Sequence, residues 1–187
     1  MNTNLQKSNS FLFAMSLVLL SCRLPGMLPL TPRPDMETNT DKVIEVLNGK
    51  DWVPLQALAA EQYTEKDFAK PGILTFTSTV TNEKPIYFSY SWCAKDEATL
   101  KQNLEHIQVV LYLDGDKLGS NVVHNLSFSR SDGMVCSDSG VLLSNWSPGK
   151  YKLKAIATFD ATINDGLDDY AAGDYGYVYN VSVEGDK

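Results

Sequence analysis

Two stretches near the C-terminus alternate between apolar and polar residues. In the first, 148–164, every second residue is apolar and only Ile156 breaks the alternation; in the second, 173–183, three tyrosines and two valines recur at the same period. Successive side chains of a β-strand point to opposite faces of a sheet, so a period of two predicts half-buried strands. The connection, 165–172, begins with turn residues. The two stretches therefore predict a long antiparallel hairpin.

The same alternation recurs earlier in the chain. Asp114-Gly115 is a strong hairpin signal, because both central positions of a tight type I′ turn need a positive φ. Residues 129–139 are polar and contain glycine, so we expect a loop there. About seven short strands separated by turn residues favour a sandwich over a βαβ fold. Besides the hairpin, the predicted strands are 72–80, 86–93, 107–113, 122–128 and 141–143.

Helical patterns precede and interrupt these strands. Residues 41–72 are expected to be a helical lead-in, with a first helix at 41–47 and a second that starts near Pro54, and to dock on one end or edge of the sheets. A further short helix is predicted at 96–104, capped by Asp96.

The sequence Pro148-Gly149-Lys150-Tyr151-Lys152-Leu153 is similar to the turn and strand found late in bacterial immunoglobulin-like domains. The resemblance extends from about Ile73 to Val183. It implies a mainly β protein whose residues 73–187 form an antiparallel immunoglobulin-like β-sandwich with short N-terminal helices. It also implies a role in binding or scaffolding.

The N-terminus has the pattern of an export signal. Lys7 precedes an apolar run at 11–20 that is too short to span a bilayer. The run ends in Leu19-Leu20-Ser21-Cys22, which resembles the lipobox of bacterial lipoproteins. The resemblance implies that 1–21 is a removed signal peptide, that Cys22 is lipidated, and that the protein is anchored to the outer face of a membrane in the bacterial cell envelope. Ordinary secretion and an uncleaved anchor remain alternatives.

A proline-rich tether is expected at 22–40. Four of the eight prolines of the chain lie within ten residues, at Pro25, Pro29, Pro32 and Pro34. Proline fixes φ and removes a hydrogen-bond donor, which favours an extended, semi-rigid segment. Its expected role is to hold the folded part away from the membrane.

Two cysteines remain once Cys22 is assigned to lipid. Export to an oxidising compartment permits a disulfide, so Cys93 and Cys136 are predicted to pair. Since Cys93 ends a predicted strand and Cys136 falls in the predicted loop, we expect the disulfide to hold that loop. A redox or catalytic thiol is the alternative, but no CxxC motif supports it.

The net charge of −7 argues against nucleic acid as a partner, because no basic stripe is present to neutralise phosphates. Acidic residues instead gather near the end of the chain. Their carboxylate and amide oxygens are the ligands that Ca²⁺ prefers, although the EF-hand spacing is absent. The alternative is a solvated acidic turn. The candidate calcium ligands are Asp160, Asn164, Asp165, Asp168 and Asp169.

Aromatic residues supply a second candidate site. Tyr170 and Trp146 are candidate ligand-binding residues that could stack on a sugar or a peptide. The alternative is that the tyrosines at 175, 177 and 179 face the core, since they alternate in phase with Val181 and Val183. This alternative is the one that the pattern favours.

Signals for catalysis are absent from the sequence. The two histidines, His106 and His124, lack metal-ligand spacing, and no GxSxG or phosphate-binding glycine loop occurs. The sequence therefore predicts a non-enzymatic, lipid-anchored binding or scaffolding module with no cofactor, acting on a protein or glycan. A Ca²⁺-stabilised carbohydrate- or peptide-binding domain, and a secreted enzyme or hydrolase accessory domain, remain alternatives.

Overall fold

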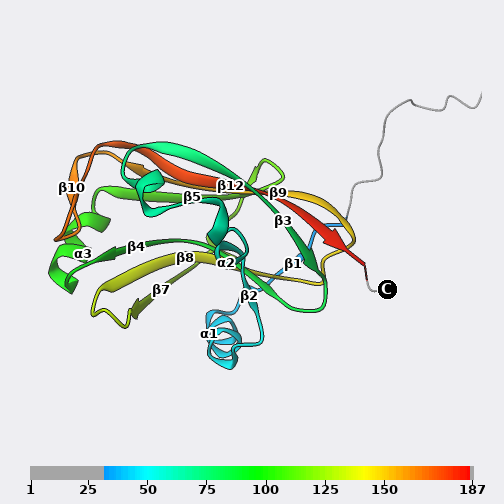
Figure 1. The fold of residues 1–187 in the computed structure, drawn as a ribbon. Helices are drawn as coiled ribbons and strands as arrows, with labels where there is room; N and C mark the ends of the chain where they lie inside the picture. Colours follow the sequence, from blue (N-terminus) through cyan, green and yellow to red (C-terminus); the bar gives the residue numbers. More distant parts are fainter. Residues whose placement is uncertain (1–31, 186–187) are drawn as a thin grey trace, which may run out of the picture. The chain divides into compact units, whose positions relative to one another are not determined.

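Two facing β-sheets make up most of the computed structural model, which describes residues 32–185 (Figure 1). The first, the β4 sheet, contains β4 (Ile86–Ala94), β8 (Val135–Ser144) and β7 (His124–Ser129), with β1 (Asp35–Met36) and β2 (Val53–Pro54) at its margins. The second, the β9 sheet, runs in the order β3 (Gly72–Thr81), β12 (Gly173–Glu184), β9 (Gly149–Phe159), β5 (Ile107–Leu113) and β6 (Asp116–Lys117). A separate ribbon pairs β10 (Ile163–Asn164) with β11 (Asp169–Tyr170). The predicted signal peptide, Cys22 and the first part of the tether lie outside the described residues.

The long hairpin is confirmed. Strands β9 and β12 pair antiparallel without interruption from Phe159↔Gly173 to Gly149↔Val183. The odd-numbered apolar positions of both strands point between the sheets: Leu153 and Ala155 are fully buried, and Tyr179 is 1% exposed. The three tyrosines of β12 therefore face the core, as their alternation with valines favours.

The prediction that every strand pairs antiparallel was wrong. Strand β3 pairs with β12 in parallel over ten residues, and β2 pairs with β4 in parallel over two. Parallel neighbours need a long connection, and here most of the domain lies between β3 and β12. The period of two shows which face of a strand is buried, but it does not show the direction of the neighbouring strand.

The loop predicted at 129–139 is confirmed only for 130–134, and was wrong for 135–139, which belong to β8. Strands β7 and β8 form a hairpin whose turn is closed by a hydrogen bond from the Arg130 N–H to the Met134 carbonyl, and β8 begins at Val135. The polar residues at 137–139 belong to β8, and several of them have hydrogen-bond partners on neighbouring strands. Ser139, for example, donates to Asn125 on the neighbouring strand over 2.7 Å. Polar residues of β8 therefore bond to neighbouring strands, whereas those at 129–133 are exposed to solvent.

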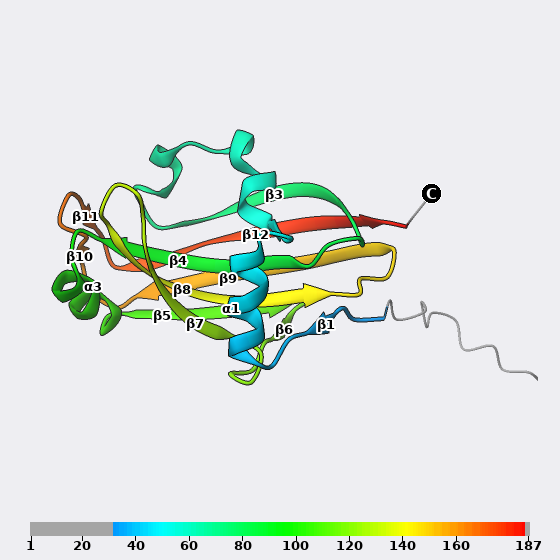
Figure 2. The same ribbon diagram turned by 90° about the horizontal axis from the view of Figure 1, so that it is seen from below.

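Helix α1 (Thr40–Gly49) lies across the outer face of the β4 sheet (Figure 2). It begins where the Asn39 side chain accepts hydrogen bonds from the first free N–H groups, a standard N-cap. Val43 packs on Tyr87 and Leu142 of the sheet below. The predicted tether therefore ends before residue 35, because β1 pairs with β8 and Thr40 already belongs to the helix.

The remaining helical segments cover one edge and one end of the sandwich. Helix α2 (Leu55–Leu58) and two 3₁₀ turns (Ala60–Gln62 and Glu65–Phe68) follow β2. The Gln62 side chain bonds both the N–H and the carbonyl of Thr77, so it covers part of the free edge of β3. Helix α3 (Glu97–Leu104), capped by Asp96 as predicted, packs near β10 at one end.

Candidate functional site

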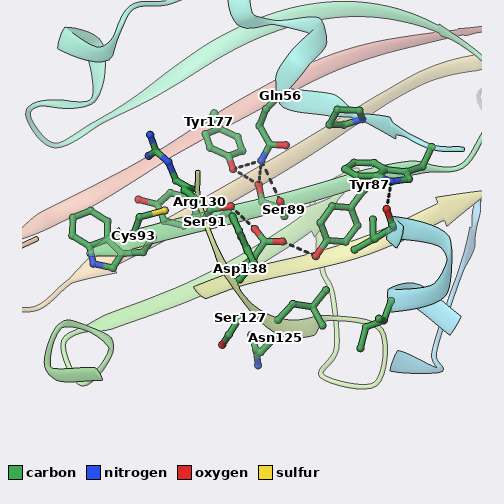
Figure 3. Close-up of a pocket in the computed structure, with 18 of the residues that line it drawn as sticks. Gln56, Tyr87, Ser89, Ser91, Cys93, Asn125, Ser127, Arg130, Asp138 and Tyr177 are labelled. Atoms are coloured by element: carbon green, nitrogen blue, oxygen red, sulfur yellow. Dashed lines mark hydrogen bonds between the residues drawn. The ribbon is translucent and has the colours of Figure 1, made fainter. Parts of the chain in front are cut away.

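A groove of about 1040 Å³ runs along strand β4 (Figure 3). Five consecutive residues, Ser89 to Cys93, line it. Because alternate residues of a strand face opposite sides of the sheet, a groove that contacts all five must follow the edge of the strand. It therefore has an outer half on the solvent face of the β4 sheet and an inner half at the open side between the two sheets.

Apolar side chains form the walls of the outer half. Ile44 and Leu47 of α1 contribute to them, and so do Leu126 and Phe128 of β7. Ile44 is 41% exposed and Phe128 is 45% exposed, so the walls present apolar surface to solvent. Exposed apolar surface around a concave site is typical of binding sites.

Aromatic rings line the inner half. Trp92 packs edge-to-face on Tyr170 with ring centroids 4.9 Å apart, and Tyr90 stacks on Tyr177 at 5.8 Å. Burial raises the pKa of Tyr170 to about 12, helped by the nearby carboxylate of Asp165. The rings thus hold one another in fixed orientations, which lowers the entropy cost of binding a ligand against them.

A buried carboxylate, Asp138, lies in the floor of the groove. It is 4% exposed and accepts hydrogen bonds from the hydroxyl of Tyr87, over 2.6 Å, and from the hydroxyl of Ser91 (Figure 3). Burial raises the pKa of Asp138, while the hydroxyl donors lower it and offset part of that effect. Burial and the negative charge of Asp138 likewise raise the pKa of Tyr87 well above its ordinary value.

A glycine makes the contact between Tyr87 and Asp138 sterically accessible. Tyr87 lies four residue pairs away from Asp138 along the β4–β8 ladder, so its ring must cross β8 at Gly140. A Cβ at Gly140 would lie 2.2 Å from the Tyr87 hydroxyl oxygen, which is far inside contact distance. Only glycine leaves room for this arrangement.

A second set of polar groups closes one end of the floor. The Gln56 Nε2 donates to the Ser89 carbonyl over 2.7 Å and lies 3.2 Å from the Tyr177 hydroxyl. The Tyr177 hydroxyl donates to the same Ser89 carbonyl (Figure 3). This bridge joins the lead-in, β4 and β12, three segments far apart in the sequence.

The predicted disulfide between Cys93 and Cys136 is present, but its position differs from the prediction. The two cysteines are direct partners on adjacent strands, β4 and β8, with Cα atoms 4.0 Å apart. Cys136 is therefore a fully buried strand residue and not a loop residue. The disulfide crosslinks the sheet at one end of the groove floor.

Four of the candidate calcium ligands, residues 164, 165, 168 and 169, bond within their own loop, whereas Asp160 pairs with His106. Asp165 is buried and accepts hydrogen bonds from the N–H groups of Leu167 and Asp168, while Asn164 donates to Asp169. In the part of the chain that the structure describes, no three histidines, cysteines or carboxylates gather as they would around a metal ion. Calcium binding by these residues stays a prediction.

Of the two predicted ligand-binding aromatics, Tyr170 lines the groove and Trp146 does not. Trp146 is 2% exposed and packs edge-to-face on Tyr151 in the core. The structure therefore does not bring the two residues together at one surface.

The two histidines have local structural partners. His124 bonds the Thr40 hydroxyl and the Glu37 carbonyl through its two ring nitrogens, and so ties α1 to the sheet. His106 pairs with Asp160 through Nδ1. The Thr40 hydroxyl lines the groove, so His124 holds one polar group of its lining in place.

Sequence reasoning missed the floor of the groove. Asp138 falls in the stretch taken as a loop, and Gln56 carries no motif. One signal was available in β4. Two small polar residues, Ser89 and Ser91, alternate with the core residues of this strand, and they lie between Tyr87 and Cys93 on the same face. A strand with two small polar residues on one face could have indicated a hollow there.

Comparisons with known proteins add little. No protein-family model matches the chain, and no curated protein matches it. Two solved structures are similar: PbICP-C in complex with falcipain-2 (TM-score 0.34, 11% identity, covering 62% of this chain and 92% of that one) and the cysteine protease inhibitor EhICP2 from Entamoeba histolytica (0.35, 13%, 62% and 96%). At these TM-scores the likeness carries no argument about fold details or function.

None of the helices described between residues 32 and 185 has the length and apolar character needed to cross a bilayer.

Proposed function

We propose that this protein is a non-enzymatic binding module, exported and held at the outer face of a bacterial membrane through lipid on Cys22, that captures a protein partner in the groove along β4. The observation that carries the proposal is the groove itself. It joins partly exposed apolar walls, fixed aromatic rings and a few buried polar groups, the combination that binding sites share.

We further propose that the sandwich is immunoglobulin-like. Two three-strand orders support this: β4–β8–β7 and β5–β9–β12 correspond to the B–E–D and C–F–G orders of such domains. Tyr151, at the start of β9, donates its hydroxyl to the Ser147 carbonyl four residues upstream over 2.8 Å, as the tyrosine corner of these domains does. The disulfide departs from the antibody pattern, because it joins two strands of one sheet.

Site-specific photo-crosslinking in the native cells tests the binding role. A photo-reactive amino acid placed at Phe128, a wall of the groove, is expected to form a discrete adduct with one partner. The matched control is the same group at Leu104, on α3, which has a similar exposure of 39% but does not line the groove. Equal adducts from both positions, or none from Phe128, would contradict the proposal.

Membrane anchoring is tested separately. Cys22→Ser is expected to abolish incorporation of labelled fatty acid and to release the protein into the soluble fraction, because lipid chains would provide the attachment. If the substituted protein stays in the membrane fraction, the anchor lies elsewhere, while the binding role remains open to the crosslinking test.

A further inference from the structure

The outward edge of β4 carries backbone groups without a strand partner. The Ser89 carbonyl receives its hydrogen bonds from Gln56 and Tyr177, so it points away from β8. The β4–β8 register is unbroken from Ile86 to Ala94, and N–H and C=O groups reverse direction at each residue. The backbone groups of Ser91 and Cys93 must therefore point the same way as those of Ser89.

The short distance between the disulfide-bonded residues supports this assignment independently. Residues that face each other without exchanging hydrogen bonds have closer Cα atoms than hydrogen-bonded pairs, about 4.5 Å against 5.5 Å. Cys93 and Cys136 lie 4.0 Å apart. Cys93 thus belongs to the set whose N–H and C=O face the open edge.

Other segments cover both ends of this edge but not its middle. Strand β2 pairs with Ile86 and Tyr87, and the Lys95 N–H donates to the Asp165 carbonyl over 2.7 Å. Between these points, no backbone or side-chain hydrogen bond reaches Ser91 or Cys93 from the outward side among residues 32–185. The open stretch coincides with the groove, which is lined by Ser89 to Cys93.

Natural proteins usually protect a free strand edge, because unpaired N–H and C=O groups attract other chains. Proline, an inward-pointing lysine or a bulge would protect this edge, yet the sequence from Ser89 to Cys93 contains neither residue and the register contains no bulge. An unprotected edge inside an apolar groove is well suited to accept a strand from another molecule.

We propose that the groove binds an extended peptide segment of its partner as an added strand along β4, with a lysine or arginine of that segment directed to Asp138. This inference rests on the proposed binding function and specifies its mode. Side chains of an added strand would alternate between the two halves of the groove: cationic ones over the outer face, and apolar ones toward Trp92 and Tyr170 in the inner half.

The carboxylate of Asp138 is the reason to expect a cationic side chain in the added strand. Asp138 is hydrogen-bonded to hydroxyl groups and takes part in none of the ion pairs between described residues; Arg130, which also lines the groove, pairs with Asp132 over 2.7 Å. Neighbouring strands lie about 4.8 Å apart, so an added strand would run about 10 Å from β8. The small side chains of Ser89 and Ser91 leave the intervening space open, and a long lysine or arginine can cross it.

A synthetic peptide provides the first test. The probe is a blocked octapeptide that alternates valine and lysine, with the valine–glutamate octapeptide as its charge-reversed control, and binding to the folded protein is measured by calorimetry at low salt. We expect the lysine peptide to bind and the glutamate peptide to bind at least tenfold more weakly. Equal binding of both, or no binding of the lysine peptide, overturns the inference.

Methylation of alternate peptide nitrogens tests strand addition without altering the protein. Only every second amide of an added strand faces β4. Methylating the lysine nitrogens should abolish binding if the strand adds antiparallel, and methylating the valine nitrogens should abolish it if the strand adds parallel; the other peptide should bind as before. If both peptides bind equally well, or both fail equally, the backbone does not pair with β4 and the inference is wrong.

Variants of the protein provide the complementary test. Ser91→Pro removes an outward N–H without removing a bond to β8, whereas Ser91→Ala removes the hydroxyl and keeps the N–H. We expect at least a tenfold loss of affinity for Ser91→Pro relative to Ser91→Ala, and a similar loss for Asp138→Asn. Equal affinity of Ser91→Pro and Ser91→Ala, with both folded, contradicts strand addition. If Phe128 crosslinks to a partner while these peptide tests fail, the binding role stands and only its mode falls.

Discussion

Removing the disulfide should destabilise the protein strongly, and the topology sets the size of the effect. Cys93 and Cys136 are 43 residues apart, and the loop that they close contains α3, β5, β6 and β7. The chain therefore leaves the β4 sheet, builds an edge of the β9 sheet and returns within this loop. The chain-entropy model gives about 4 kcal/mol for a closed loop of this length, a large share of the stability of a typical domain.

The test compares the oxidised protein with the double variant Cys93→Ser, Cys136→Ala, in which alanine avoids burying a hydroxyl at the fully buried position. We expect the free energy of unfolding, from urea titration, to fall by about 4 kcal/mol, and Tm to fall by about 8–16 °C for a domain of this size. A reducing agent should lower the stability of the native protein to that of the variant and leave the variant unchanged. A loss under about 1 kcal/mol would refute the reasoning, since it would mean that the unfolded chain gains little freedom when the loop opens.

Three further predictions follow from individual contacts. Burial raises the pKa of Asp138, so the folded state keeps the carboxyl protonated to a higher pH than the unfolded chain does. The stability that this difference contributes is therefore full at low pH and is lost as pH rises through the folded pKa. Asp138→Asn should therefore gain stability relative to the native protein between pH 4 and pH 7 in urea titrations, and a difference that does not change with pH would contradict this. A Cβ at Gly176 would lie 2.2 Å from the Ala155 carbonyl oxygen, so Gly176→Ala should lower the free energy of unfolding by at least about 2 kcal/mol. The control Gly49→Ala, at a position with open space around it, should be neutral or slightly stabilising. Similar values for the two variants would contradict this, since they would show that β12 can shift. Since Asp165, Asn164 and Asp169 already bond within their loop, Tm should be the same in Ca²⁺ and in chelator, and a rise with Ca²⁺ would establish the metal site.

The strands that alternate most regularly were the easiest to predict. In β9 each buried position is apolar because it faces the opposite sheet, and the tyrosines and valines at the odd-numbered positions 175–183 of β12 follow the same rule, so the pattern and the pairing agree. Strand β8 was half missed because Cys136 and Asp138 are buried by specific bonds and not by hydrophobicity. A polar residue that is satisfied by a distant partner looks, in a sequence, the same as one that is solvated.

The candidate site was missed for the same kind of reason. Gln56, Tyr87, Asp138 and Tyr177 belong to four segments, and no local spacing relates them. Their proximity follows from strand order: β8 beside β4 brings Asp138 to Ser91, and the lead-in beside the open edge brings Gln56 to Ser89. Even the one predicted aromatic that lines the groove, Tyr170, is there because a two-strand ribbon holds it against Trp92.

The amino-acid sequence by itself determined the sandwich class, the long hairpin, the cap of α3 and the availability of two cysteines, because each of these depends on residues close together in the chain or on composition. Tertiary structure alone decided that β3 runs parallel to β12, that the disulfide lies within one sheet, and that β4 keeps an open edge beside a buried carboxylate. These features depend on which strands become neighbours, and that choice is made by the packing of the whole core and not by any one segment.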